Sequence, residues 1–351
     1  MGKRILYVAS SVGHINAFHL EIIGRLCRLG FSVSVMARGG RDFDIPFEKR
    51  IFSLKNLRLI PRIRKILEKE RFDAIILNTA LASALLRLAL PKRIKKTTKL
   101  VNIVHGYLFA PTVGVIKRLF FFLVERILAS RCDAVITMNS EDFRTAKKYA
   151  LSKRIFLCDG VGARDVPIRR TREKTREIIG VADAPLITFV GELSRRKNQE
   201  FLIKGLKKIR EEIPRATLCL VGDGAERDRL SGLVERLSLS HAVIFTGYRD
   251  DACDYTFSSD LYASAASVEG LPINVVEAAR LGIPLLLSDI KGHRDVLEHG
   301  ADGELFCFGD ADDFARRAVR ILKSGKKGKR LFGFEREVCA QRLVEIILEV
   351  I

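Results

Sequence analysis

The sequence predicts an α/β fold in which two Rossmann-like domains each carry a doubly wound parallel sheet. Short apolar runs alternate with helix-like segments along the chain, which is typical of successive βαβ units. The alternation stops at a polar, arginine-rich segment, Arg164–Arg176, which we expect to be a linker, and then begins again. A chain of 351 residues is also too long for one ordinary core. We therefore expect domains at 1–165 and 166–334, and a helix at 335–351 that can pack back on the N-terminal domain.

The N-terminal half contains five apolar runs of strand length, with helix-like segments between them. The expected strands are Arg4–Ala9, Ser32–Ala37, Ala74–Asn78, Leu100–Val104 and Ala134–Thr137. The expected helices are Asn16–Leu29, Ile60–Lys69, Ile116–Ser130 and Glu141–Lys148.

The same pattern is repeated in the C-terminal half. The expected strands are Leu186–Gly191, Thr217–Val221, Val243–Thr246, Asp260–Ser264 and Pro284–Ser288. The expected helices are Gln199–Glu212, Glu226–Leu237, Ile273–Leu281 and Ala311–Lys323, with a last amphipathic helix at Glu335–Ile351. Two such halves imply a cleft between them, and ligands of these sheets bind beyond the carboxyl ends of the strands. The loops that directly follow strands are therefore the places to search for chemistry.

The net charge of +19 is distributed unevenly. Residues 1–168 contain 31 Lys and Arg against 13 Asp and Glu, whereas residues 169–351 contain 30 against 29. A basic half can attract an anionic lipid surface or a nucleic acid. Because no basic-aromatic nucleic-acid module accompanies the charge, we expect an anionic membrane surface as partner and no nucleic acid. Ordinary solvated surface charge is the alternative.

One apolar segment with interspersed basic residues bears on the membrane question. Val113–Leu128 is either a buried helix or, together with Arg58–Arg71, an interfacial helix on an anionic bilayer. No run reaches the ~18 apolar residues of a membrane-spanning helix. The seven cysteines are scattered and include no C-x-x-C pair, which favours a reducing cytoplasm. Since the sequence also shows neither a D-x-D loop nor a His/Cys cluster, we expect no metal site and no cofactor.

The most specific motif is the segment 269–277, EGLPINVVE, which follows the strand Asp260–Ser264. Gly270 allows close approach of a ligand, and Pro272 suits the entry to a helix. The amides of Ile273, Asn274 and Val275 are then expected to be open, at the positive end of the helix dipole, as a diphosphate site. A carboxylate one turn later, Glu277, can accept both hydroxyls of a ribose. The alternative is an ordinary helix N-terminus with two exposed acids.

A second motif is the segment 191–199, GELSRRKNQ, between the strand Leu186–Gly191 and a helix. Its cations can clamp the negative charge that develops on a departing diphosphate. The alternative is a charged surface loop. Gly222 and Gly224, in the next post-strand turn, need no more than a tight turn to explain them.

Two histidines follow strands in the N-terminal half. His14, in the segment SVGHIN at 11–16, comes after the first strand, where it can meet an acceptor. His105 comes directly after Leu100–Val104, in a His-Gly turn. A lone histidine is more often structural, but these two of only six occupy matching positions in the predicted sheet.

Taken in order, these motifs resemble those of retaining glycosyltransferases of family four, which have the GT-B fold, in the branch that assembles capsular, exopolysaccharide and lipid-linked glycans. Glu192 and Asn198 depart from the Arg and Gly that the family commonly has there. The resemblance implies catalytic roles for His105, Glu269, Arg196 and Lys197. It implies donor contacts for Gly191, Arg196, Lys197, Gly222, Tyr248, Arg249, Glu269, Gly270, Leu271, Pro272, Ile273, Asn274, Val275 and Glu277, and acceptor contacts for Gly13, His14 and Asn16.

In this resemblance Glu269 contacts the donor sugar, Glu277 the ribose, and Arg196 with Lys197 the diphosphate, while Arg195 faces solvent. The implied reaction is a metal-independent, retaining transfer of a hexose or N-acetylhexosamine from a UDP-sugar to a glycan acceptor linked to a polyprenyl diphosphate. The implied location is the inner face of the cell membrane. The alternative within the same fold is a nucleotide-sugar epimerase. A dehydrogenase is disfavoured, since the first β-α turn lacks the dinucleotide fingerprint.

Overall fold

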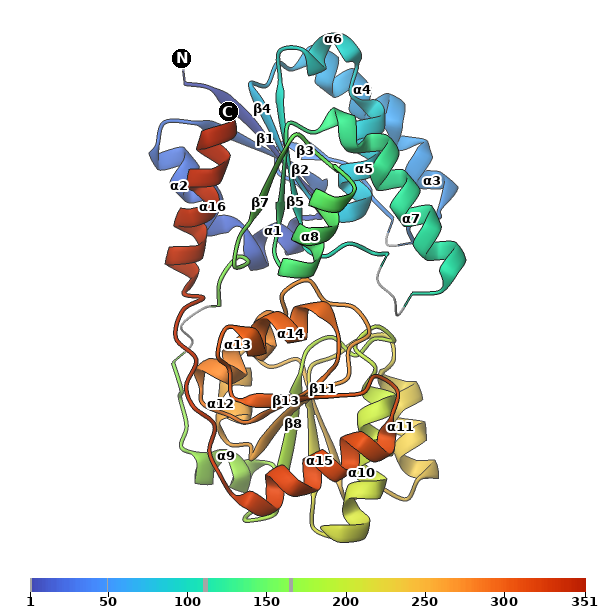
Figure 1. The fold of residues 1–351 in the computed structure, drawn as a ribbon, viewed down its shortest axis with the longest axis vertical. Coiled ribbons are helices and arrows are strands. Elements are labelled where there is room, and N and C mark those ends of the chain that lie inside the picture. Colours follow the sequence, from blue (N-terminus) through green and yellow to red (C-terminus); the bar gives the residue numbers. More distant parts are fainter. Residues whose placement is uncertain (1, 49, 110–112, 164–166) are drawn as a thin grey trace. The chain divides into compact units, whose positions relative to one another are not determined.

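The computed structural model describes residues 2–48, 50–109, 113–163 and 167–351 (Figure 1). The chain forms two compact units, one of Met1–Gly162 with Phe334–Ile351 and one of Ala163–Gly333. The predicted boundary between 165 and 166 falls on residues outside the described part. The linker predicted at Arg164–Arg176 is not loop throughout, because helix α9 (Arg172–Ile178) begins inside it. The Thr171 side chain accepts from the amide of Lys174 and caps this helix.

A seven-stranded sheet forms the centre of the first unit, in the order β3-β2-β1-β4-β5-β6-β7. All its pairings are parallel. The strands are β1 (Arg4–Ser11), β2 (Ser32–Arg38), β3 (Phe43–Asp44), β4 (Ala74–Asn78), β5 (Lys99–Val104), β6 (Ala134–Thr137) and β7 (Arg154–Leu157). The five predicted strands are present. The sequence did not predict β3 and β7, which lie at the two edges, where a strand needs less apolar surface.

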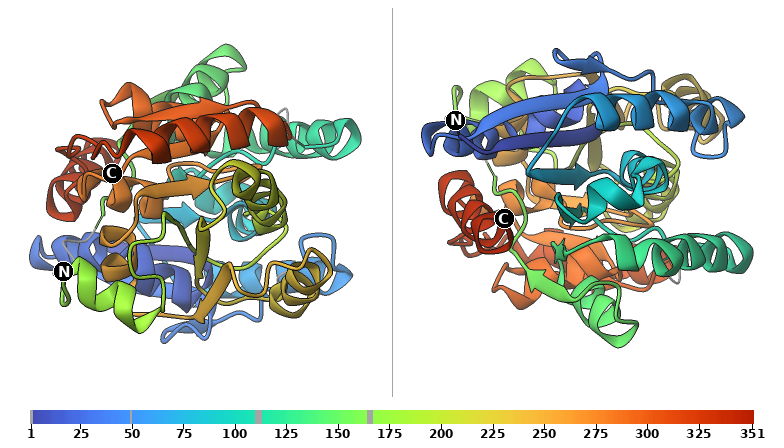
Figure 2. Two further views of the ribbon diagram at one scale, coloured as in Figure 1. Left: turned by 90° about the horizontal axis from the view of Figure 1, so that it is seen from below. Right: turned by 90° about the horizontal axis from the view of Figure 1, so that it is seen from above.

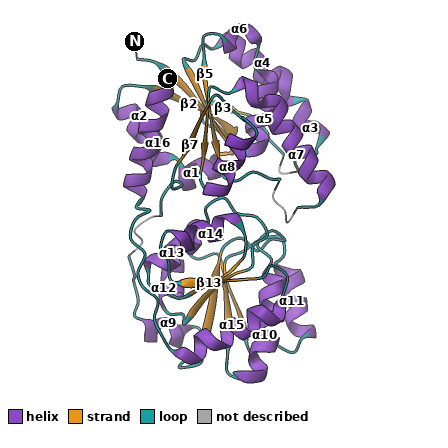
Figure 3. Cartoon of the chain, in the orientation of Figure 1, coloured by secondary structure: helices purple, strands orange, loops and turns teal. Residues whose placement is uncertain are grey.

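Helices cover the two faces of this sheet (Figure 3). They are α1 (Val12–Phe18), α2 (Leu20–Arg28), α3 (Leu54–Leu57), α4 (Leu59–Lys69), α5 (Ala80–Ala89), α6 (Lys92–Lys95), α7 (Val115–Leu128) and α8 (Ser140–Lys148). The single helix predicted at Asn16–Leu29 is wrong, because the chain leaves helical geometry at His19 and forms α1 and α2 separately. Helix α5 was not predicted. Among the described residues, no helix is long and apolar enough to span a bilayer.

The last helix, α16 (Arg336–Val350), belongs to the first unit although it ends the chain. It packs on α2 and β5, and Figure 2 shows it beside the N-terminal segment. Arg25 on α2 donates to Gln341 on α16 at 2.9 Å, and the Lys3 ammonium donates to the carbonyl of Ile351 at 2.9 Å. Gly162 has a φ of +74°, and a Cβ there would lie 2.5 Å from the Cα of Arg336, so only glycine fits this crossing.

The second unit contains a parallel six-stranded sheet in the order β10-β9-β8-β11-β12-β13. Its strands are β8 (Leu186–Val190), β9 (Thr217–Val221), β10 (Val243–Gly247), β11 (Leu261–Ser264), β12 (Leu285–Ser288) and β13 (Gly303–Phe306). Its helices after α9 are α10 (Gln199–Glu212), α11 (Arg227–Arg236), α12 (Ala252–Phe257), α13 (Ile273–Arg280), α14 (Lys291–Glu298) and α15 (Ala311–Ser324). The sequence did not predict α12, α14 and β13. The prediction of two doubly wound parallel sheets is confirmed, whereas the cleft between the two halves stays a prediction.

Candidate functional site

Two loops that follow neighbouring strands of the second unit are joined by hydrogen bonds. One follows β8 and contains Arg196, and the other follows β11 and contains Ser267. The carbonyl of Arg196 accepts hydrogen bonds from the Ser267 amide at 2.9 Å and from its hydroxyl at 3.2 Å. The Arg196 guanidinium in turn donates to the carbonyl of Val268 at 3.0 Å. The strand order β8-β11 thus brings the two strongest sequence motifs together at the carboxyl edge of the sheet.

The centre of this site is a carboxylate between two cations. One Glu269 oxygen lies 2.6 Å from the Lys197 ammonium and 2.6 Å from the Arg196 guanidinium. The side chains of Glu269 and Lys197 are nearly buried, at 11% and 10% exposure, whereas that of Arg196 is 45% exposed. Burial alone raises the pKa of the Glu269 carboxyl, but the charges of Lys197 and Arg196 outweigh it and hold this pKa below its usual value.

Helix α13 begins directly beside this cluster. Pro272 is its N-cap, and the amides of Ile273 and Asn274 have no hydrogen-bond partner within the described part of the chain. The expectation of a third open amide is wrong, because the N–H of Val275 donates to the carbonyl of Pro272 at 3.0 Å. The Asn274 side chain donates to the Val190 carbonyl at 2.5 Å and to the Tyr262 hydroxyl at 2.8 Å, which fixes the start of α13 on β8 and β11.

The remaining residues of the predicted donor motif lie around this helix start. Gly270 is buried and Leu271 half-buried. A Cβ on Gly292, which belongs to α14, would lie 2.4 Å from the Gly270 carbonyl, so α14 closes over the loop. Glu277 lies one turn into α13, close enough for its charge to act on Tyr262 and Cys253. Burial and then Glu277 raise the pKa of the Cys253 thiol to about 12, so this cysteine is an unreactive thiol.

Close packing explains why glycine occupies positions 191 and 222, in the turns after β8 and β9. A Cβ on Gly222 would lie 2.0 Å from the Gly191 carbonyl, and both residues have positive φ. Their direct contact with a ligand stays a prediction. Asn198 has a φ of +57°, in the left-handed region that glycine and asparagine tolerate best, which explains why Asn replaces the Gly common in the family. The Arg195 side chain is 85% exposed, as expected.

Tyr248 and Arg249 follow β10. The Tyr248 side chain is largely exposed. Arg249 makes two hydrogen bonds of 2.8 Å to the carboxylate of Asp251, and these lower the pKa of that carboxyl. Since its guanidinium already has this partner, the structure does not join Arg249 to the Glu269 cluster, and its predicted contact with a base stays a prediction.

The sequence reasoning missed His293, on α14. The ring is fully buried, and its Nδ1 lies 2.8 Å from the carbonyl of Ser288, so Nδ1 carries the hydrogen. Nε2 is then an acceptor, and it has no partner among the described atoms. Burial lowers the pKa of His293 to about 4. The signal that could have found it is its position, five residues after the end of β12 and in the first turn of the helix that follows.

In the first unit, the two predicted histidines lie together with a third. His14 is on α1 and His105 follows β5, while His19 stands between α1 and α2. The Nε2 atom of His19 lies 3.3 Å from that of His14 and 3.1 Å from that of His105. The expectation of no histidine cluster is therefore wrong. It was based on the spacing of histidines along the sequence, whereas His105 comes close to His14 and His19 only in the folded chain. Gly13 and Asn16 lie exposed on α1, and their acceptor contacts stay predictions.

Burial lowers the pKa of all three imidazoles, to about 4 for His14 and about 3 for His105, where the charge of His14 adds to the effect. The pKa of His19 is lowered in the same direction by burial and by its two neighbours. All three rings are therefore neutral at pH 7. The contact of His105 with a donor sugar stays a prediction.

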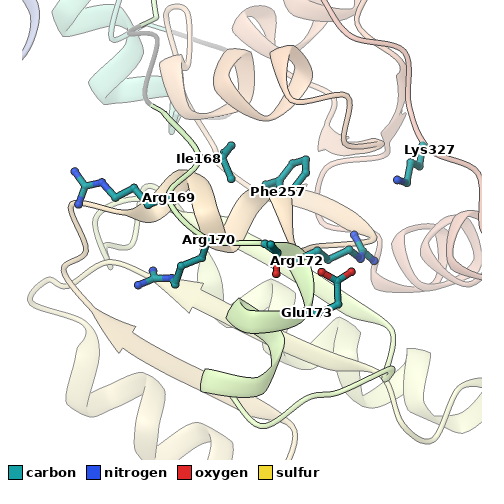
Figure 4. A pocket seen from close by; sticks show the side chains of 8 residues that line it. Ile168, Arg169, Arg170, Arg172, Glu173, Phe257 and Lys327 are labelled. Carbon is teal, nitrogen blue, oxygen red and sulfur yellow. The ribbon is translucent and has the colours of Figure 1, made fainter.

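A cavity in the second unit lies at the start of α9 (Figure 4). Its lining includes Arg172, which pairs with Asp260 directly before β11. The cavity is thus at the amino end of the sheet, while Glu269 follows the carboxyl end. Arg169, which also lines it, pairs with Asp250 at 3.1 Å. We assign no part of the predicted site to this cavity.

The two parallel sheets, together with the cation-carboxylate cluster in the loops after β8 and β11, define the class. Residues 16–156 match the family model described as Glycosyltransferase Family 4, and residues 171–332 match that of Glycosyl transferases group 1. The chain is a family-four glycosyltransferase with the GT-B fold, as its motifs predicted.

The curated relatives carry related names. The putative glycosyltransferase EpsD of Bacillus subtilis (strain 168) is 28% identical, over 94% of this chain and 92% of its own. A UDP-Gal:alpha-D-GlcNAc-diphosphoundecaprenol alpha-1,3-galactosyltransferase of Escherichia coli is 27% identical, over 80% of this chain and 74% of its own.

Among solved structures, HepE of Anabaena, in complex with UDP and glucose, is 21% identical and superimposes with a TM-score of 0.68, covering 99% of this chain and 100% of its own. Sucrose-phosphate synthase of Thermosynechococcus elongatus is 19% identical, with a TM-score of 0.78 and coverage of 99% and 98%. These two likenesses show the fold.

Proposed function

We propose that this glycosyltransferase transfers a hexose or N-acetylhexosamine from a UDP-sugar to a glycan linked to a polyprenyl diphosphate, with retention of the anomeric configuration, in the synthesis of a cell-surface polysaccharide. The observation that carries the proposal is the contact of Glu269 with both Lys197 and Arg196 beside the start of α13. The names of the Escherichia coli galactosyltransferase and of the HepE complexes support UDP as the carrier, and the former supports the acceptor class.

The donor site works by exchange of ionic partners. In the structure the single negative charge of Glu269 is shared by Lys197 and Arg196, so one positive charge of the cluster is left over. A diphosphate brings more negative charge and more acceptor oxygens, so it replaces the carboxylate at the two cations. The open amides of Ile273 and Asn274 add two donors at the positive end of α13. Glu269 is then free to accept hydrogen bonds from hydroxyls of the transferred sugar, and Glu277 from those of the ribose.

The same groups favour departure of the nucleoside diphosphate. Negative charge grows on the leaving diphosphate as the glycosidic bond breaks, and cations fixed in advance stabilise that charge most strongly in the transition state. The acceptor hydroxyl attacks the face that the diphosphate leaves, and the departing phosphate oxygen takes its proton. In this proposal, side-chain cations neutralise the leaving group without a metal ion at the diphosphate.

A membrane-facing surface on the first unit fits a lipid-linked acceptor. Ten of the 22 exposed large apolar side chains among the described residues lie in two segments, 51–57 and α7. Phe52 contacts Phe120 and Phe121, with ring centroids 5.2 and 5.9 Å apart, so the two segments adjoin. We call this surface the apolar patch. Its members are Ile51, Phe52, Leu54, Leu57, Val115, Ile116, Leu119, Phe120, Leu123 and Ile127.

The charge around the apolar patch is basic. Arg50, Lys55, Arg58 and Lys117 are exposed in or beside it. Its two segments contain one acid, Glu125, which is paired with a buried arginine. Exposed apolar side chains surrounded by cations are typical of a surface that rests in the headgroup region of an anionic bilayer. We place the enzyme peripherally at the inner face of the cell membrane.

The test is the release of UDP from a panel of UDP-sugars, with and without polyprenyl-diphosphate-linked glycans. We expect UDP to accumulate only when both substrates are present. Glu277→Ala should abolish this release without loss of helical content, whereas Glu235→Ala, an exposed acid on α11, should leave it unchanged. Full activity in Glu277→Ala contradicts the site, and interconversion of the donor sugar without an acceptor identifies an epimerase instead.

A further inference from the structure

The three histidines of the first unit converge on one point through the same ring atom. The Nε2 atoms of His14 and His105 lie 3.3 and 3.1 Å from the Nε2 of His19, and the ligand atoms of all three lie within 4.8 Å of one another. We propose that His14, His19 and His105 form a binding site for one divalent transition-metal ion of the zinc type. The site is in the first unit, so it goes beyond the proposed sugar transfer and its diphosphate site in the second.

The spacing of the nitrogens matches tetrahedral zinc. Zinc–imidazole bonds are about 2.0–2.1 Å long, and at the tetrahedral angle two such nitrogens are about 3.3–3.4 Å apart. The two contacts of His19, at 3.3 and 3.1 Å, are within about 0.3 Å of that separation. The rings are also not stacked, since the planes of His14 and His105 are at 90° and those of His19 and His105 at 81°. Three imidazoles that bind one ion must approach it from different directions, and these ring orientations allow that.

Hydrogen bonds among the rings cannot account for the cluster. An imidazole nitrogen has either one hydrogen or one lone pair in the ring plane, so it makes one good hydrogen bond. The Nε2 of His19 has two nitrogen neighbours within hydrogen-bond distance. One of these two nitrogen–nitrogen contacts therefore cannot be a good hydrogen bond. A metal ion bound by all three Nε2 atoms accounts for both contacts.

The other ring nitrogen of His19, Nδ1, has a hydrogen-bond partner, as the second nitrogen of a metal-binding histidine usually does. This Nδ1 lies 2.9 Å from the hydroxyl of Tyr7, which is fully buried in β1. Asn78, at the end of β4, lies near the same Tyr7 side chain, and its amide donates to the carbonyl of Val8 at 3.3 Å. A partner on the second nitrogen fixes the ring orientation and directs Nε2 at the ion, which is the usual outer-shell arrangement of metal-binding histidines.

The donor set selects the class of ion. Three imidazoles suit Zn²⁺, Co²⁺, Ni²⁺ or Cu²⁺, whereas Mg²⁺ and Ca²⁺ prefer oxygen ligands. His14 and His105 are only half-buried, so a fourth position remains for a water or for an oxygen of a bound ligand. This assignment gives His14 and His105 the role of ligands in place of direct contacts with sugars.

Metal binding is tested directly on untagged, full-length protein freed of metal by dialysis. Zn²⁺ is titrated in competition with a chromogenic chelator, and Co²⁺ binding is followed by its visible absorption. We expect one ion per chain and the intense Co²⁺ bands of a tetrahedral site. His14→Gln and His105→Gln should each weaken Zn²⁺ binding by at least about 100-fold and remove the Co²⁺ bands.

Two histidines of the second unit provide matched controls. His241→Gln and His299→Gln should bind one ion with wild-type affinity, which excludes adventitious binding to surface histidines. Circular dichroism confirms the fold of each variant. The proposal is overturned if wild-type protein binds no Zn²⁺ in competition with the chelator, or if both folded ligand variants bind it as tightly as wild type. Since no donor or acceptor is present, this outcome is independent of the proposed transferase activity.

Discussion

At the scale of single residues, the donor site depends on two cations that share one carboxylate. Lys197 is the more buried cation, and its ammonium lies 2.6 Å from the Glu269 carboxylate. Arg196 is half exposed and has a second partner in the carbonyl of Val268. Because a buried charge interacts more strongly than an exposed one, Lys197 contributes more to stabilising a diphosphate.

Lys197→Met keeps much of the side-chain volume and removes the charge. We expect the kcat/KM of sugar transfer to fall by roughly 10²–10³-fold, the loss typical of one electrostatic group at a developing charge. The measurement is steady-state UDP release. Arg195→Ala, two residues away and 85% exposed, is the matched control and should retain wild-type activity. Equal losses in both variants contradict a specific role of Lys197.

His293 makes the second unit sensitive to acid. Its pKa is about 4 in the folded chain against about 6.5 when unfolded, since burial disfavours its charged form despite the nearby carboxylates of Glu269 and Asp289. Lys197 adds a repulsive charge. Below pH 6.5 the unfolded state therefore binds a proton that the folded state does not. Stability is lost as the pH falls from about 6.5 to about 4, by up to about 1.4 kcal/mol per pH unit.

Urea denaturation between pH 7 and 4.5 measures this effect. His293→Gln should lose less stability over that range than wild type, although it is less stable at pH 7. His241→Gln, which removes an exposed histidine of the same unit, should follow the wild-type pH dependence. If the free energy of unfolding falls equally with pH in wild type and His293→Gln, His293 does not titrate as described.

At the scale of elements, α7 is fixed to the first unit by an ion pair that the apolar pattern does not reveal. The Arg87 guanidinium on α5, only 1% exposed, makes two hydrogen bonds of 2.9 and 2.8 Å to the Glu125 carboxylate. The apolar side chains of α7 are largely exposed, so this pair and Phe122 hold the helix in place. The sequence left a buried helix or an interfacial helix open for this segment. The exposed side chains show that α7 is not a buried helix, and its contact with a membrane stays a prediction.

Glu125→Ala leaves the Arg87 charge buried without a partner. We expect a loss of roughly 3–5 kcal/mol, as for other broken buried pairs. This corresponds to a fall of roughly 6–20 °C in the unfolding midpoint of a unit of this size, measured by calorimetry. Glu68→Ala breaks the exposed pair with Arg93 and should lower the midpoint by far less. Equal effects would show that burial of the Arg87 pair has no energetic consequence.

At the scale of the whole molecule, the basic charge and the apolar patch are both in the N-terminal half. We expect the protein to co-sediment with vesicles that contain phosphatidylglycerol and not with vesicles of phosphatidylcholine alone. High salt should weaken the binding, because exposed charges are screened. The double variant Leu54→Glu/Ile116→Glu should bind roughly tenfold or more weakly, since it removes two exposed apolar side chains and adds two negative charges.

Phe332→Glu provides the control for this experiment. Phe332 is 84% exposed but belongs to the second unit, so its variant should bind vesicles as wild type does. Equal binding of all variants would remove the apolar patch as the membrane contact.

Much of this fold could be read from the sequence, because a buried parallel strand is a local apolar run and the order of such runs determines the alternation of strands and helices. The missed elements show the limit of that reading. Edge strands β3 and β7 are less buried, and α12 and α14 are short helices of six and eight residues. The split at His19 was missed because apolar spacing continues across it.

The sequence by itself determined the two parallel-sheet units, the post-strand loops and the residue types Glu269, Arg196 and Lys197 within them. Tertiary structure decided which of these side chains meet. His105 reaches His19 across 86 positions, and Arg196 reaches Glu269 across 73, because parallel strands with crossover helices bring the ends of distant segments to one edge of a sheet. Periodicity is a local property of the chain, whereas these contacts depend on strand order, which the local pattern does not contain.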